Sequence, residues 1–283
     1  MGSSAKNWLL GCGLSCLAVV VLVVGLAVGF GVWMRGKVRG FEQAIDQQEQ
    51  LEQRFGSDEA FVPWPDGAVP PERMESFLAV REATAAPRAE IAAFFTMLPK
   101  SEEERQRIDD SSFLEKLRFA MRVGSAGVGM AEHTAEFMRA RNTALEHEGL
   151  GMGEYTYIYV TAYYAALGHS PADDEGHGSA EELAGRWKAA EARTTFLAQL
   201  RGLRESLGHG AGADDATWAA TLAAEIEALE SDSRRAPWQD GLPEAIRASV
   251  EPYRDRLDST YNPATNPFEL AHGEKRGMSI RID

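Results

Sequence analysis

The sequence predicts an all-α protein in which one N-terminal transmembrane helix is followed by a multi-helix bundle. Three observations support this fold class: a long uncharged apolar run near the N-terminus, apolar residues at helical spacing through the rest of the chain, and turn residues between these periodic stretches. No stretch has a pattern that clearly predicts a strand. The 283 residues are enough for one or two folded domains, and two cysteines exclude a disulfide scaffold.

The membrane segment is the clearest feature of the sequence. Residues 7–34 carry no charged side chain, a run of 28 residues. A bilayer core of about 30 Å is spanned by about 20 helical residues, and Trp8 and Trp33 stand near the two ends, where indoles favour the headgroup level. The run is too long for a secretory signal peptide, and no small-residue cleavage site follows it. We therefore expect an uncleaved, single-pass signal anchor within residues 1–39, in contact with the lipid bilayer through residues 8–34.

The charges that flank the span favour one orientation. Arg35, Lys37 and Arg39 follow it, whereas Lys6 and the α-amino group precede it. By the positive-inside rule, this asymmetry favours a cytoplasmic body over a periplasmic one. Only six of the 29 basic residues are Lys, a composition typical of a GC-rich bacterial genome, so the expected location is a bacterial inner membrane.

Small residues recur within the span. Gly25 and Gly29 stand four residues apart and therefore share one face of a helix. Such a pair allows two helices to approach closely, which predicts a homodimer through this face. The alternative is that glycine is simply common in transmembrane helices.

The charge of the remaining chain excludes one class of partner. Residues 40–283 contain 25 basic and 43 acidic side chains, a formal charge of −18. A surface of this sign repels phosphate backbones, so we expect no nucleic-acid binding.

Turn residues and periodicity divide the chain beyond the anchor. Residues 40–55 have apolar side chains at heptad spacing over about two heptads, which predicts a juxtamembrane helix that is either a weak stalk or a packed helix. Residues 56–70 are rich in Pro and Gly and predict a linker. Residues 71–260 predict the helical-bundle domain, and residues 261–283 a loose C-terminal tail.

Apolar periodicity places the helices of the bundle. We expect a helix from Pro71 that Pro87 kinks or splits, and one last helix from about Pro243 to Asp258. Three glycines within 124–129 predict either a break in a long helix or a close helix crossing. The further helices are expected at 112–147, 154–167, 179–207 and from Asp214 or Asp215 onward.

The helix at 154–167 has the most unusual composition, with five Tyr among ten residues. Tyr155, Tyr159 and Tyr163 share a helical spacing of four, and apolar residues on every side predict a buried central helix. One interpretation is a pocket for an apolar or aromatic ligand, lined by these three side chains with Glu154 as the polar anchor. The alternative is core packing, with the hydroxyls bonded to Arg and Glu side chains.

A second candidate site lies in the long helix before it. Glu132, His133 and Glu136 fall within one helical turn and would ligate a metal ion if other helices supplied further ligands. The alternative is a solvated polar face. The Glu-x-x-His pattern of di-metal bundles occurs at Glu269 and His272, in the predicted tail.

The function classes follow from what is present and what is missing. The sequence contains no GxxxxGK[ST], HExxH or GxSxG motif, and it implies no cofactor. We expect a membrane-anchored, non-catalytic interaction or sensing module with a protein partner. The alternative is a helical bundle that binds a ligand or a metal through the tyrosine-rich helix, with or without enzymatic activity.

Overall fold

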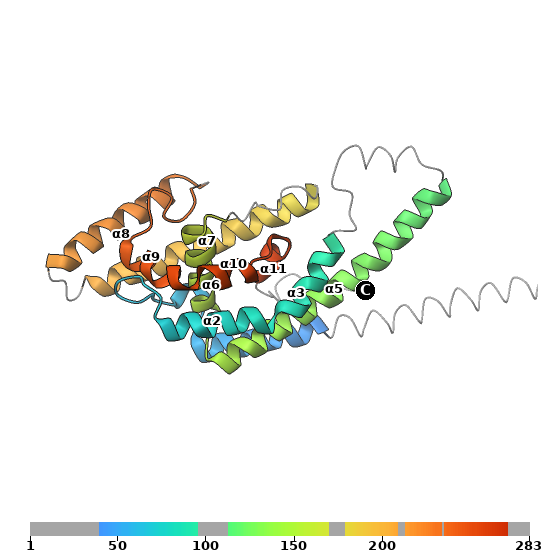
Figure 1. The fold of residues 1–283 in the computed structure, drawn as a ribbon, viewed down its shortest axis with the longest axis horizontal. Coiled ribbons are helices and arrows are strands. Elements are labelled where there is room, and N and C mark those ends of the chain that lie inside the picture. The colour runs from blue at the N-terminus through green and yellow to red at the C-terminus, as the bar shows by residue number, and fades with distance from the viewer. Residues whose placement is uncertain (1–39, 96–112, 170–178, 209–212, 234, 271–283) are drawn as a thin grey trace, which may run out of the picture. The chain divides into compact units, whose positions relative to one another are not determined.

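The computed structural model describes residues 40–95, 113–169, 179–208, 213–233 and 235–270. These residues form helices and turns and no strand, so the predicted all-α helical bundle is confirmed (Figure 1). The expected span at 8–34, with Gly25 and Gly29, lies outside the described residues. Among the helices within them, none has the length and apolar character needed to cross a bilayer.

The chain divides into two compact units, residues 1–43 and 44–283. Only 40–43 of the first unit are described, and they are helical. In the second unit, residues 44–55 continue as helix and bury Ala44, Ile45 and Leu51, as expected of a packed helix rather than a stalk.

The segment predicted as a linker, 56–70, packs against the core of the second unit. It contains a short 3-10 helix, η1 (Asp58–Ala60), and otherwise turns. Val69 is buried, and Phe61 and Trp64 contact the core, because large apolar residues alternate with its Pro and Gly. The division by contacts therefore falls ahead of this segment and not within it.

Two helices lie along a third in the first half of the bundle: α2 (Pro71–Ala83) and α3 (Ala85–Phe95) both pack on α5 (Phe113–Glu148) (Figure 1). Pro71 occupies the first position of α2, where its missing N–H costs nothing. The predicted split near Pro87 is confirmed, since the chain turns at Thr84 and the proline falls in the first turn of α3.

The predicted break at the glycines of α5 is wrong, because the helix runs unbroken through 36 residues. Among the described residues, a Cβ added at Gly129 would meet only His133 of the same helix, at 3.9 Å, so no other described helix crosses closely at that position. The cost of about 1 kcal/mol per glycine is small enough for a long helix to carry.

The tyrosine-rich segment is helical and central, as predicted. It begins as α6 (Met152–Tyr159), whose eight residues are all buried, and continues as a π-helix, η2 (Val160–Ala166). The π-helical continuation was not predicted, since no residue pattern marks it. α7 (Ser179–Leu207) packs on α6, and α8 (Ala213–Ser231) packs on α7.

The C-terminal part of the bundle differs from the prediction in two ways. The single helix expected at 243–258 is interrupted at Pro252, and the tail expected to be loose from 261 is packed through Leu270. Pro263 and Pro267 start short helices here, because proline fits the first turn of a helix. The elements are α9 (Glu244–Val250), η3 (Glu251–Tyr253), α10 (Arg254–Thr260), η4 (Pro263–Thr265) and α11 (Asn266–Glu269).

Candidate functional site

An ion pair with no exposed surface lies in the described core. Arg81 of α2 places Nη1 2.5 Å from Oε2 of Glu269 on α11. The same guanidinium donates from Nη1 to the Tyr155 hydroxyl at 3.0 Å, from Nε to the Tyr163 hydroxyl at 3.2 Å, and from Nη2 to the Thr260 carbonyl at 2.7 Å. Arg81 therefore joins α2 to the central helix and to the C-terminal helices.

Both oxygens of the Glu269 carboxylate have hydrogen-bond donors. Oε2 accepts from the Tyr155 hydroxyl at 2.9 Å, and Oε1 accepts from the Thr265 hydroxyl at 3.0 Å. Burial raises the pKa of Tyr155, so this phenol stays neutral and donates. Such charge-assisted bonds satisfy a carboxylate that has lost its water.

The other inward tyrosines bind the same C-terminal elements. The Tyr159 hydroxyl donates to Asn266 Oδ1 at 2.7 Å, and the Tyr163 hydroxyl lies 2.8 Å from the Thr260 hydroxyl. Burial also raises the pKa of Tyr159 well above its ordinary value. Tyr155, Tyr159 and Tyr163, which we call the inward tyrosines, are thus bonded to residues between 260 and 269. Tyr157 of the same helix is also fully buried, but its hydroxyl donates to the Gly67 carbonyl.

A second buried guanidinium, that of Arg88 on α3, binds backbone carbonyls. Its Nε donates to the Thr84 carbonyl at 3.3 Å, and its terminal nitrogens donate to the carbonyls of Arg81 and Thr260. The Thr260 carbonyl therefore accepts from two guanidiniums, Arg81 and Arg88.

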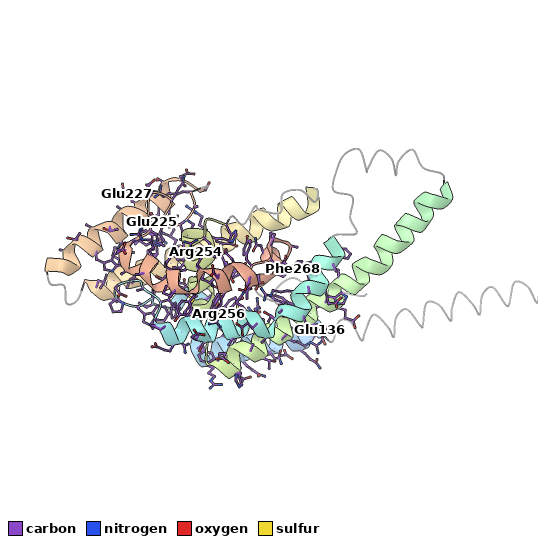
Figure 2. The ribbon with its side chains drawn as sticks, viewed as in Figure 1. Glu136, Glu225, Glu227, Arg254, Arg256 and Phe268 are labelled. Atoms are coloured by element: carbon purple, nitrogen blue, oxygen red, sulfur yellow. The ribbon has the colours of Figure 1, made fainter. Side chains whose placement is uncertain are left out.

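A third buried guanidinium, that of Arg141 on α5, binds the end of α11. Its Nη1 donates to the carbonyls of Phe268, at 3.2 Å, and Glu269, at 2.7 Å; Figure 2 labels Phe268 on this element. The neighbouring Asn142 donates to the Ala44 carbonyl at 2.9 Å. We call the three arginines with Glu269 and the inward tyrosines the buried Arg–Glu–Tyr centre (Arg81, Arg88, Arg141, Glu269, Tyr155, Tyr159, Tyr163).

The carbonyls bound by the three arginines share a position at helix ends. Thr260 ends α10, Phe268 and Glu269 close α11, and Arg81 lies in the last turn of α2. The last four carbonyls of a helix have no donor within the helix, and they favour nearby cations. Three guanidiniums and one carboxylate are buried in this centre, so backbone carbonyls balance the positive charge that Glu269 does not.

The pKa directions show that the charged pair stays charged. Burial alone would raise the pKa of Glu269, but the attraction of Arg81 and Arg88 holds it below its ordinary value. Burial opposes the charge of Arg81 as well, but attraction by Glu269 raises its pKa well above the ordinary value. Burial lowers the pKa of Arg88, and the charge of Arg81 lowers it further. A general base needs a pKa near the working pH, and Glu269 has moved the other way.

The residues predicted to form a ligand pocket lie in two places. Tyr155, Tyr159 and Tyr163 come together in the buried centre without exposed surface. Glu154 lies apart from them, 9% exposed, and accepts two hydrogen bonds from Arg73 of α2 at 2.5 and 2.7 Å. This arrangement agrees with the core-packing alternative, and ligand binding by these residues stays a prediction.

The residues predicted to ligate a metal lie together on one turn of α5. Glu132 and Glu136 are exposed on α5, where Figure 2 labels Glu136, and His133 is half-buried. Within the part of the chain that the structure describes, no group of three or more His, Cys, Asp and Glu side chains could hold a metal ion. Metal binding at these residues gains no support.

The sequence interpretation missed the arginines and Glu269. A signal was present for α2, since Arg81 stands four residues after Phe77 and seven after Met74, on the face that becomes buried. Arg88 follows Arg81 by a further seven residues. Glu269 had no such signal, because its Glu-x-x-His pattern with His272 fell in the segment predicted as a loose tail.

A cleft with a volume of about 20 Å³ lies away from this centre, between the helix of residues 44–55 and α5. Leu51, Arg54, Asn142 and Glu146 are among the side chains that line it. This volume holds about one water molecule, which is too small for an organic ligand.

Comparison with known proteins gives no relative. No protein-family model matches the chain, no curated protein matches it, and no solved structure matches it. The functional assignment therefore rests on the residues and their geometry.

Proposed function

We propose that this protein is a single-pass, membrane-anchored all-α protein whose helical body is a non-catalytic interaction or sensing module. The observation that carries the proposal is the uncharged run of residues 7–34, which is long enough to span a bilayer. The anchor holds the body at the membrane, where a high local concentration makes weak contacts effective. In this proposal the body lies on the cytoplasmic side of a bacterial inner membrane.

The chemistry of the buried centre supports a role other than catalysis. Arg81 and Glu269 have no exposed surface, and each is bonded to protein groups. A catalytic acid or base has to reach a substrate atom, directly or through one water. The centre instead fixes how the C-terminal elements pack on α2, α3, α5 and α6.

The surface supports a partner bound through polar contacts. Among the side chains that the structure places, Val62, at 45% exposure, is the exposed large apolar one. On that part of the surface, recognition depends on charge and hydrogen bonds. The formal charge of −18 on residues 40–283 favours a protein partner with a basic surface and disfavours nucleic acid.

Membrane extraction tests the anchor. We expect the full chain to stay in the pellet after alkaline carbonate washing of bacterial membranes, and a chain of residues 40–283 to appear in the supernatant. Val21→Arg with Val24→Arg should release the full chain, since charged residues at the centre of a span are costly. Val21→Leu with Val24→Leu is the matched control and should stay in the pellet. A full chain found in the supernatant contradicts the anchor.

The same membranes test orientation and dimerisation. Protease added outside spheroplasts should leave a cytoplasmic body intact, and digestion of the body would place it in the periplasm instead. We propose that two copies meet through Gly25 and Gly29, so that replacing both by Ile lowers chemical cross-linking of the full chain. Unchanged cross-linking would exclude this face.

A further inference from the structure

The last described residues of the chain, 262–270, which we call the C-terminal segment, are held mainly by polar groups. Thr265, Asn266 and Glu269 are buried, and Leu270 is its buried apolar residue. Elsewhere the described core is made mainly of apolar and aromatic side chains, with a minority of buried polar groups such as Gln199 and Glu225. The attachment of this segment therefore depends on specific hydrogen bonds and charge more than on apolar area.

The surface that holds the segment binds both its side chains and its backbone. Arg81 and Tyr155 bind the Glu269 carboxylate, and Tyr159 binds the Asn266 amide. Arg141 binds the backbone carbonyls at the end of the segment. We call these four residues, with Arg88 beside them, the arginine–tyrosine cradle. A set of donors that binds a carboxylate, an amide and main-chain carbonyls together is typical of peptide recognition.

The segment is built so that it can leave the cradle. It begins where the backbone is extended, at Tyr261 and Asn262, and it contains one three-residue and one four-residue helix. Helices this short are not stable alone, so outside the cradle the segment is a flexible peptide. No described element follows it, so its release moves no other described helix.

The energetics also favour replacement of the C-terminal segment in the cradle by another peptide. The desolvation cost of a buried ion pair offsets much of its attraction, so such a pair gives specificity more than net stability. Segments with few buried apolar contacts open locally at lower free energy than the core. A competing carboxylate peptide would restore the same bonds, whereas water would leave the arginines in the cradle without an anion.

We propose that the arginine–tyrosine cradle is a binding site for an acidic peptide, occupied in this structure by the chain's own C-terminal segment. The ligand class is a peptide with a Glu side chain for Arg81 and Tyr155, an amide side chain for Tyr159 and free carbonyls for Arg141. The inference rests on the proposed role as an interaction module, and it specifies the class of partner that this module binds. It does not depend on the membrane span.

A labelled synthetic peptide of residues 261–271 (YNPATNPFELA) is the probe, and fluorescence anisotropy with the full chain in detergent is the measurement. In the chain variant Glu269→Gln, the C-terminal segment is bound more weakly by the cradle. We expect this variant to bind the peptide at least about tenfold more tightly than the wild-type chain does, because a tethered segment competes at an effective concentration of about millimolar. The peptide that carries Glu269→Gln should bind to the Glu269→Gln chain about tenfold more weakly than the wild-type peptide does, because the bonds to a charged acceptor are lost.

Control measurements show whether a change in peptide binding comes from the cradle or from misfolding of the variant chain. Circular dichroism confirms that the Glu269→Gln chain is folded, and the Glu75→Gln chain, altered at an exposed ion pair, should bind like the wild type. If Glu269→Gln does not fold, hydrogen exchange on the wild-type chain decides: excess peptide should speed exchange at amides 262–270, and the Gln peptide should not.

Two results would overturn the proposal. One is a folded Glu269→Gln chain that binds neither peptide or binds both equally; the other is exchange at 262–270 that the peptide leaves unchanged. Carbonate extraction is unaffected by either result, so failure here and failure of the proposed anchor are distinguishable.

Discussion

At the scale of single residues, Glu269 holds the C-terminal segment to the core. It neutralises Arg81, accepts from Tyr155 and Thr265, and lies on a helix of only four residues. Removing its charge leaves Arg81 buried without an anion, which costs more than the intact pair contributes. Substitutions in this centre should therefore have large effects.

We expect Glu269→Gln to lower the free energy of unfolding by about 3–5 kcal/mol, the usual cost of breaking a buried pair by removing one partner. Glu75→Gln removes an exposed carboxylate that pairs with Arg256 and should cost at most about 1 kcal/mol. Urea denaturation of both variants measures the difference. Equal effects would mean that the buried pair contributes no more than a surface one.

The stability of the protein should depend on pH through the protonation of the Glu269 carboxylate. Its pKa in the folded protein lies below the ordinary 4.5, so the unfolded chain takes up the proton first as the pH falls. The stabilisation is complete above about pH 4.5 and is lost as the pH falls through the folded value. Thermal melts should show a shallower acid limb for Glu269→Gln than for the wild type. An unchanged acid limb would contradict the lowered pKa.

Tyr159→Phe should lower stability by about 1–3 kcal/mol, because Asn266 Oδ1 loses its buried donor. Tyr253→Phe is a matched control: this half-buried tyrosine makes no side-chain hydrogen bond with the described residues, so its effect should stay within about 0.5 kcal/mol. Chemical denaturation measures both. A neutral Tyr159→Phe would show that the Asn266 bond contributes nothing.

Residue spacing predicted part of this centre. The interval of four predicts that Tyr155, Tyr159 and Tyr163 share a helix face. The bonds of Tyr155 and Tyr163 to Arg81, and of Tyr155 to Glu269, agree with the packing alternative. Arg81 was not identified, because a charge on a helix face usually indicates solvent, and Glu269 was not, because it falls in the segment predicted as a loose tail. Their pairing joins residues 188 positions apart, and no local pattern encodes such a contact.

At the scale of elements, glycines and prolines decided where prediction succeeded. Pro71 predicts a helix start and Pro87 a kink or split, and both agree with the structure, since proline is accepted in a first turn. Pro263 and Pro267 also lie in first turns, but their segment was predicted as a loose tail, so η4 and α11 were not predicted. The glycines of α5 predict a break or a close helix crossing, although a 36-residue helix accommodates them.

Two glycines in helices give opposite predictions. Gly153→Ala should destabilise the protein by about 1–3 kcal/mol, because its Cβ would lie 2.7 Å from the Asp58 carbonyl and from Phe61 Cβ. Gly129→Ala should stabilise it by about 0.5–1 kcal/mol, because the space around it is open and alanine favours helix. Thermal melts of both variants test the close approach of η1 to α6. The same sign for both would contradict it.

At the scale of the whole molecule, the compact second unit begins at residue 44. Leu51 belongs to its core, and Asn142 donates to the Ala44 carbonyl. A fragment that starts after the predicted linker would lose these contacts, so the body is best separated from the proposed anchor at residue 40. Such a fragment isolates the body from the membrane without cutting its core.

Native mass spectrometry of residues 40–283 tests the central claim, that the body is a non-catalytic interaction module with a closed Arg–Glu–Tyr centre. We predict the mass of the polypeptide alone, because Arg81, Glu269 and the inward tyrosines already bond to one another. A stoichiometric additional mass the size of a metal ion or a small molecule would contradict the claim and would favour a ligand- or metal-binding bundle that uses the tyrosine-rich helix.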